Sequence, residues 1–170
     1  FADDGLQGLQ KAFDAGIRHV QLVHFLDNRI GDIQTARPSY GGLSDYGRQV
    51  IIECERLGLL VDLAHCTGEV VQDALSVATR PLIWSHSSIV GGTRSNWQMP
   101  GWKSRQLALS DAKAIAAKGG VVGLWALGAD VGTSPQAYAA RVEQVVDLMG
   151  DDHVGFGSDM NALASPALAN

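Results

Sequence analysis

Short apolar runs alternate along this chain with segments whose apolar residues recur at helical spacing. The runs have the length of buried strands and occupy 17–25, 59–65, 81–86, 121–126 and 153–159. Helical spacing occurs at 6–15, 44–58, 69–78, 110–118 and 134–149. Strands that alternate with helices and are apolar throughout predict an α/β fold with a parallel sheet.

Capping residues mark the ends of several predicted helices. Ser44 and Thr67 each precede a helical segment and are predicted N-caps, as is the pair Ser110-Asp111. Ser134-Pro135 begins the last helix, and Gly58 ends the second. The face that the last helix is predicted to bury consists of Ala139, Val142, Val145, Val146 and Met149.

Three of the predicted strands end in a side chain that can bind a metal or move a proton. His65 and His86 end the second and third strands, and Asp159 ends the fifth. Active residues on several successive strand ends favour a (β/α)8 barrel over an open sheet, and the chain has about five strands where a closed barrel has about eight. We therefore expect residues 1–170 to form one domain, the C-terminal part of a TIM barrel that lacks its first strands.

His65 and His86 are candidate metal ligands, because neutral imidazole is a common ligand of zinc. Each follows an apolar run and precedes small or polar residues. Either could instead make hydrogen bonds within a loop or the core, and the spacing does not decide between the two interpretations.

Other candidates lie near the same strand ends. The Asp159 carboxylate could accept a proton from a metal-bound water, or could cap a backbone N–H. His24 could donate to a developing oxyanion, and Asp62 is interpreted as a structural residue or as one that orients a metal-bound histidine. Two aperiodic segments, 26–42 and 87–106, are predicted loops. The second loop is the more cationic, and its Arg94 could pair with a substrate carboxylate or lie in solvent.

Composition limits the class of partner. The net charge of −5 and the pI near 5.4 argue against nucleic acid or an anionic membrane surface. There is no apolar run of ~20 residues, and the two cysteines, Cys54 and Cys66, do not suggest a disulfide framework. The start has neither a methionine nor a signal-peptide pattern, so we expect a processed chain or a piece of a longer one. The compartment stays open, with the cytoplasm slightly favoured.

Several motifs together resemble the renal or membrane dipeptidase family of zinc peptidases. They are GLSDYG at 42–47, ECERLGLLVDLAH at 53–65, WSHSS at 84–88, GGVV at 119–122 and VGFGSD at 154–159. The resemblance extends from Gly16 to Asn161 in the expected order.

The resemblance implies a (β/α)8 barrel of the amidohydrolase type that holds a pair of bridged zinc ions and hydrolyses dipeptides through a metal-bridging hydroxide. It implies that His65 and His86 bind one of the two metals and that Asp159 handles the proton of the bridging water. His24 would contact the substrate and polarise the scissile carbonyl. Arg94 and Asn96 match the adjacent Arg-Asn of the family, which holds the dipeptide carboxylate, although Ser95 separates them here.

The front of the family pattern is not found in this sequence. The His-x-Asp motif of the first strand and the glutamate that bridges the metals are both expected ahead of Gly16. We therefore expect association with an N-terminal segment that supplies them, or a homo-oligomer. The alternatives are a related metal amidohydrolase that acts on another amide or ester, and a non-catalytic barrel fragment without a complete metal site.

Overall fold

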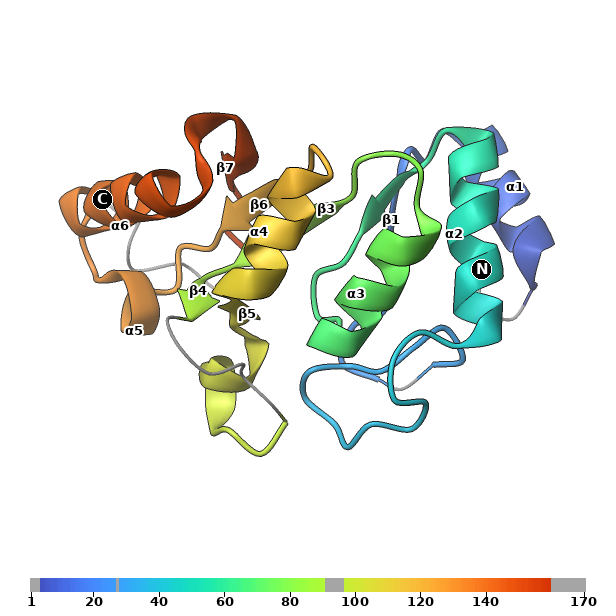
Figure 1. Cartoon of the computed structure of the whole chain (residues 1–170), viewed down its shortest axis with the longest axis horizontal. Coiled ribbons are helices and arrows are strands. Elements are labelled where there is room, and N and C mark those ends of the chain that lie inside the picture. The colour runs from blue at the N-terminus through green and yellow to red at the C-terminus, as the bar shows by residue number, and fades with distance from the viewer. Residues whose placement is uncertain (1–3, 27, 91–96, 160–170) are drawn as a thin grey trace.

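The computed structural model describes residues 4–26, 28–90 and 97–159 (Figure 1). Its helices are α1 (Leu6–Asp14), α2 (Asp45–Leu57), α3 (Gly68–Val77), α4 (Leu109–Ala117), α5 (Gly128–Val131) and α6 (Pro135–Met149), with 3-10 turns η1 (Gly101–Arg105) and η2 (Asp151–His153). Its strands are β1 (His19–Gln21), β2 (Leu60–Asp62), β3 (Ile83–Ser87), β4 (Ile89–Val90), β5 (Leu107–Ala108), β6 (Val121–Leu124) and β7 (Val154–Phe156). No helix in the described ranges is long and apolar enough to cross a membrane.

Five of the strands form one sheet in the order β1-β2-β3-β6-β7. Every neighbouring pair in it is parallel, with Val20 opposite Val61 and Trp84 opposite Val122. The remaining strands, β4 and β5, form a separate parallel pair. The predicted α/β fold with a parallel sheet is confirmed, and all five strand ends lie along one edge of that sheet.

The helices form a layer against the sheet. Helices α1, α2, α3, α4 and α6 follow one another as neighbours, and α2, α3 and α4 lie side by side in front of the strands (Figure 1). The strand residues that face this layer are fully buried, among them Val61, Trp84 and Val122. Because side chains alternate along a strand, the intervening residues point to the opposite face, where the polar groups of the candidate site gather.

Three of the predicted helix caps are confirmed. The hydroxyl of Ser44 accepts a hydrogen bond from the Gly47 N–H, that of Thr67 from Val70, and that of Ser134 from Ala137. Gly58 ends α2 with φ 76°, a left-handed conformation that glycine adopts without strain. These ends could be predicted because each depends on a few adjacent residues.

The strands are shorter than the apolar runs predicted. The runs at 17–25 and 59–65 contribute only His19–Gln21 and Leu60–Asp62. Beyond Asp62 the chain leaves the sheet, because the Asp62 carboxylate accepts the Ala64 N–H and His65 adopts φ 70°. The predicted loop 87–106 contains two further short elements, β4 and η1.

Two predictions for helices were wrong. Helix α4 begins at Leu109 with Ala108 as N-cap, and the Asp111 side chain is buried and accepts a hydrogen bond from Gln72 instead of capping. On α6, Ala139 is exposed and Tyr138 is buried in its place. The Tyr138 hydroxyl donates to the Leu124 carbonyl at 2.7 Å, which draws this ring toward the sheet.

Candidate active site

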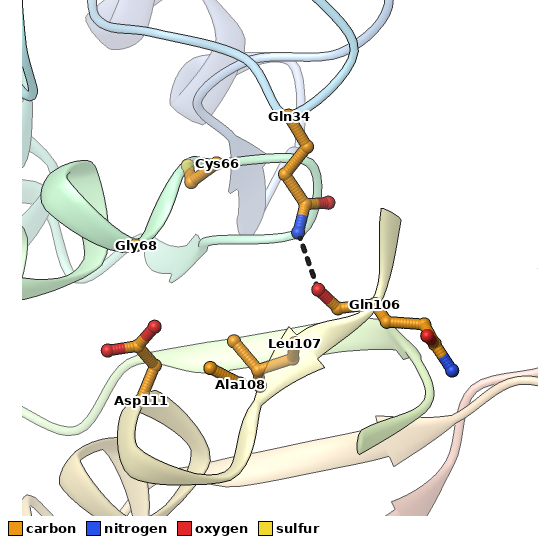
Figure 2. Close-up of a pocket in the computed structure, with 7 residues that line it drawn as sticks. All are labelled: Gln34, Cys66, Gly68, Gln106, Leu107, Ala108 and Asp111. Atoms are coloured by element: carbon orange, nitrogen blue, oxygen red, sulfur yellow. Dashed lines mark hydrogen bonds between the residues drawn. The ribbon is translucent and has the colours of Figure 1, made fainter. Parts of the chain in front are cut away.

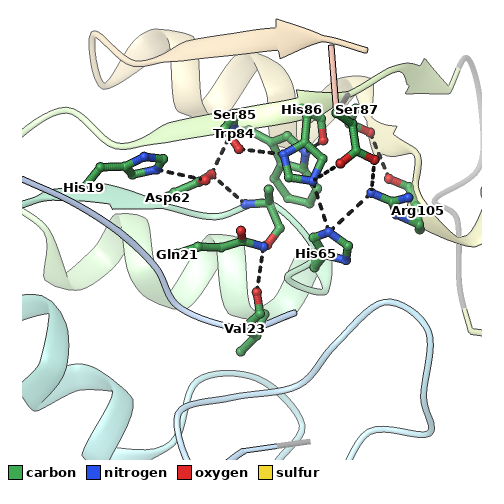
Figure 3. A network of polar contacts seen from close by, with 12 residues as sticks. His19, Gln21, Val23, Asp62, His65, Trp84, Ser85, His86, Ser87 and Arg105 are labelled. Atoms are coloured by element: carbon green, nitrogen blue, oxygen red, sulfur yellow. Dashed lines mark hydrogen bonds and ion pairs between the residues drawn. The ribbon is translucent and has the colours of Figure 1, made fainter. Parts of the chain in front are cut away.

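His65 and His86 meet at the carboxyl end of the sheet, from the ends of β2 and β3. Their Nε2 atoms face each other at 3.0 Å, and Figure 3 shows both rings pointing toward the same point as Arg105. The ring of His24, which follows β1, lies 4.5 Å from the ring of His65 between centroids. Two side chains that lie 21 positions apart in sequence thus form a single cluster.

Local backbone features aim these side chains. His65 and Asp159 both have positive φ, 70° and 53°, a conformation that non-glycine residues adopt at a cost of roughly 1 kcal/mol or more. The pairing of β3 with β6 shifts register between Trp84 and Ser87, which places a bulge in the segment that contains Ser85 and His86. A Cβ on either Gly123 or Gly157 would collide with the Ser85 carbonyl oxygen, so only glycine allows the strands to close around this bulge.

Asp62 connects the two strands that carry the histidines. Its Oδ1 accepts hydrogen bonds from the backbone N–H of Ala64 at 3.0 Å and of Ser85 at 2.9 Å. Its Oδ2 lies 3.0 Å from Nε2 of His19, and the carboxylate is buried (Figure 3). Ser85 in turn places its hydroxyl 2.7 Å from Nδ1 of His86. The carboxylate therefore fixes the backbone next to both imidazoles.

Arg105 and Asp159 complete the cluster from the other side. Nη2 of Arg105 donates to Oδ2 of Asp159 at 2.8 Å and lies 3.3 Å from Nε2 of His65. Oδ1 of Asp159 lies 3.6 Å from Nε2 of His86. Both charged side chains remain partly accessible, 17% for Arg105 and 31% for Asp159, so a small polar ligand can reach them.

The imidazoles are held in their neutral forms. Burial, with the nearby charges of Arg105, His86 and His24, lowers the pKa of His65 to about 3. Burial also lowers the pKa of His86, although Asp159 and Asp62 oppose the shift. Because a guanidinium can only donate, the His65 Nε2 that faces Arg105 must present its lone pair, which assigns the proton to Nδ1. A neutral ring with an available lone pair is the form that binds a metal.

The histidine pair fits a metal ion as part of a ligand set. Two nitrogen ligands of a tetrahedral zinc ion, each at the usual bond length, are about 3.3 Å apart, close to the observed 3.0 Å. Within the described ranges, however, no three His, Cys, Asp or Glu side chains are arranged to hold an ion together. The pair supplies two ligands, and further ligands have to come from elsewhere.

A small cavity of about 10 Å³, room for a single water molecule, is lined in part by Cys66 and Gln106, which directly follow His65 and Arg105 in the chain (Figure 2). Its lining consists of Gln34, Cys66, Gly68, Gln106, Leu107, Ala108 and Asp111. Gln34 Nε2 donates to the Gln106 carbonyl at 3.1 Å, and the Gln34 N–H donates to the His65 carbonyl. Cys66, which follows His65 in the chain, lines this cavity, and both Cys66 and Cys54 are buried free thiols.

Comparison with known proteins bears on this arrangement. The profile of the membrane dipeptidase family, peptidase family M19, matches residues 2–168. The chain belongs to the membrane dipeptidase family.

Relatives in this dipeptidase family are longer than the chain. It is 32% identical over 174 residues to an uncharacterised dipeptidase of Schizosaccharomyces pombe. The aligned region covers 95% of the chain and 39% of that protein. It is also 32% identical over 158 residues to dipeptidase tcpJ of Claviceps purpurea, with 88% of the chain and 35% of that protein covered. The chain thus spans less than half the length of these relatives.

Solved structures establish the fold of this dipeptidase-family chain. An amidohydrolase from Pseudomonas aeruginosa superimposes with a TM-score of 0.81 at 24% identity, over 94% of the chain and 47% of that structure. A metallo peptidase from Rhodobacter sphaeroides was solved with a phosphinate mimic of the dipeptide L-Ala-D-Ala. It superimposes with a TM-score of 0.75 at 24% identity, over 98% of the chain and 48% of that structure. The predicted α/β fold of the TIM-barrel hydrolase type is confirmed.

The structure brings together four of the predicted site residues of this dipeptidase-family member: His24, His65, His86 and Asp159. Their individual roles stay predictions. Arg94 and Asn96, the predicted carboxylate-binding residues, lie outside the described residues.

Sequence reasoning missed Arg105, the guanidinium that the structure places in the cluster. It belongs to the same cationic loop as Arg94, and that shared loop was the only signal available. The position of Arg105 depends on the turn η1 and on the hydrogen bond that the Ser87 hydroxyl of β3 donates to the Arg105 carbonyl at 2.8 Å, a tertiary contact that no local pattern reveals.

Proposed function

We propose that the protein containing this chain is a zinc-dependent dipeptidase. The observation that carries the proposal is the meeting of two neutral imidazoles, a carboxylate and a guanidinium at the ends of parallel strands. Two features lend further support, the family match across residues 2–168 and the likeness to a metallo peptidase that was solved with a dipeptide mimic. Dipeptide cleavage calls for an activated water, a proton carrier and a partner for the substrate carboxylate. The imidazoles with their metal, the carboxylate and the guanidinium would fill these three roles in turn.

His65 and His86 would hold one of the metal ions through their Nε2 atoms, which are neutral and face each other. Bound there, zinc would polarise the scissile carbonyl and lower the pKa of a water molecule. The remaining ligands would come from a segment that precedes these residues in a longer chain, or from a second copy. Asp62 and Ser85 keep the two imidazoles in position through the contacts described above.

Asp159 would carry the proton. Its Oδ1 lies on the side of His86, where it can accept a proton from the attacking water and pass it to the leaving amine. His24 is exposed beside His65, so its ring can donate a hydrogen bond to the carbonyl oxygen as negative charge develops. Both roles use groups that are partly accessible and adjacent to the histidine pair.

Arg105 would bind the carboxylate of the dipeptide. Its guanidinium is the described cation at the cluster, and guanidinium pairs with carboxylate through two parallel hydrogen bonds. In the free protein Asp159 occupies one of its donors. Substrate binding would exchange this internal partner for the substrate's own carboxylate, which also frees Asp159 for proton transfer.

The test is hydrolysis of a panel of dipeptides and acylated amino acids by the zinc-loaded protein. We expect dipeptides to be cleaved, with kcat/KM reduced about 1,000-fold or more in His65→Ala. His153→Ala is the matched control, because His153 bonds the Gly120 carbonyl away from the cluster and should leave the rate unchanged. Cleavage of acylated amino acids alone would indicate a different amidohydrolase. Equal activity in wild type and His65→Ala would overturn the proposal.

A further inference from the structure

Phe25 is an exposed aromatic residue in contact with the candidate site. Its side chain follows His24 directly and is 51% exposed. Even so, its ring centroid lies 4.3 Å from that of His24 and 4.8 Å from that of His65, edge to face in both cases. A single exposed apolar residue is ordinary, but one that contacts two of the site's imidazoles forms part of the wall that a ligand would touch.

Phe25 also forms one side of the environment of Arg105. The guanidinium carbon lies 5.3 Å from the Phe25 ring centroid and 5.2 Å from that of Trp125. Trp125 is buried and its Nε1 donates to Asp130 at 2.7 Å, so this ring is fixed. Phe25, by contrast, presents half of its surface to solvent. A carboxylate on Arg105 would therefore have an open apolar surface next to it on the Phe25 side.

The geometry points to Phe25 as the residue that selects the C-terminal side chain of the substrate, in favour of bulky apolar residues. This inference rests on the proposed function, in which Arg105 binds the dipeptide carboxylate. The side chain of the C-terminal residue is attached to the carbon next to that carboxylate, which places it within reach of an aromatic ring about 5 Å from the guanidinium. An apolar side chain that covers Phe25 removes apolar surface of both from water, whereas glycine leaves the ring exposed.

The size of the effect follows from the hydrophobic contribution of a single side chain. An apolar pocket that is open on one side discriminates by about 10- to 100-fold in kcat/KM between a large side chain and none. We expect a ratio of this size between Ala-Leu and Ala-Gly, two dipeptides that differ only in the C-terminal side chain.

The experiment compares kcat/KM for Ala-Leu and Ala-Gly in the zinc-loaded protein and three variants. Phe25→Ala is expected to lower the Ala-Leu to Ala-Gly ratio about tenfold, while Phe25→Leu keeps most of it because the apolar surface remains. Tyr40→Ala is the matched control, since Tyr40 is 52% exposed in the segment between β1 and α2 that also carries Phe25, and its loss should leave both rates and their ratio unchanged. An unchanged ratio in Phe25→Ala would overturn the inference, whether both rates stay the same or both fall by the same factor.

A binding measurement separates this inference from the proposed function. If no dipeptide is cleaved, the proposed function fails. The inference is then judged by calorimetric titration with acetyl-leucine and acetyl-glycine, which present the same carboxylate with and without a side chain. Tighter binding of acetyl-leucine that is lost in Phe25→Ala supports the apolar subsite. Equal affinity for the two, or binding of neither, overturns it. If both dipeptides are cleaved equally well, the dipeptidase proposal stands and the role of Phe25 falls.

Discussion

Asp62 takes no part in the proposed chemistry, yet its carboxylate joins the two strands that carry His65 and His86. A buried acceptor that satisfies two backbone N–H groups is costly to remove, because each N–H left unpaired costs about 1–3 kcal/mol. The same bonds set the position of Ser85, whose hydroxyl faces His86. The geometry of the histidine pair and the stability of the strand ends therefore depend on one side chain.

Asp62→Ala is expected to lower the free energy of unfolding by about 2–5 kcal/mol, since it leaves the N–H groups of Ala64 and Ser85 without their partner. Zinc affinity should fall about 10- to 100-fold, as it does when a group that orients a ligand is lost. Urea unfolding and competition with a chelating dye measure the two effects. Asp62→Asn is the control, because its amide oxygen can still accept both N–H groups. Unchanged zinc affinity in a folded Asp62→Ala protein would contradict this account.

Among the individual site residues, the sequence predicted those whose positions follow from strand periodicity. His65, His86 and Asp159 each come after an apolar run, so their meeting at one edge follows from a parallel sheet. Arg105 could not be predicted in the same way, because its position depends on the turn η1 and on contacts with residues 40 and 54 positions away. The approach of Gly157 to the Ser85 carbonyl is likewise a tertiary contact that no local pattern encodes.

Among the elements, helix α2 is joined to the turn that leads into β3 by hydrogen bonds to a single carboxylate, that of Glu55. Glu55 accepts hydrogen bonds from the N–H of Thr79, the hydroxyl of Thr79 and the N–H of Arg80, at 2.8, 2.8 and 2.9 Å. Burial alone would raise the pKa of Glu55, but these bonds, with the charge of Arg80, hold it below its ordinary value of 4.5. A folded-state pKa below the unfolded value means that the carboxylate stabilises the protein above pH 4.5 and loses this effect as pH falls through the folded value.

Glu55→Gln is therefore expected to destabilise the protein at pH 7 by about 1 kcal/mol, and by progressively less as pH falls below about 4. Urea unfolding of both proteins across this pH range measures the difference. Glu143→Gln, an exposed position on α6, is the control and should show no such trend. A difference between wild type and Glu55→Gln that stays constant with pH would indicate that the shape of the side chain matters, and not its charge.

The ends of elements could be predicted where they depend on adjacent residues. Ser44, Thr67 and Ser134 cap their helices as their sequence context indicates. The start of α4 could not be predicted, because Asp111 is drawn away from a capping role by Gln72 of α3. The pair β4 and β5 was missed for a similar reason, since two-residue strands gain their stability from each other and not from their own sequence.

For the whole molecule, the alternation of apolar runs predicted five parallel strands, and the sheet contains them in chain order. This order places the site residues of β1, β2, β3 and β7 on one edge, so the candidate site spans the full width of the described sheet. Strands β1 and β7 each pair on one side within the described residues, and these two edges are where the barrel of the family would continue. We propose that the remaining metal ligands belong to strands that would continue the barrel beyond these two edges.

The measurement that tests the central claim most directly is the zinc content of the purified whole protein that contains this chain, after gel filtration, in wild type, His65→Ala and His86→Ala. If the two histidines bind one ion, wild type retains zinc and each variant loses about one ion per chain. His19→Ala, which removes an imidazole outside the histidine pair, should lose much less. A wild-type protein that retains no zinc, or variants that retain as much as wild type, would contradict the assignment of His65 and His86 as metal ligands.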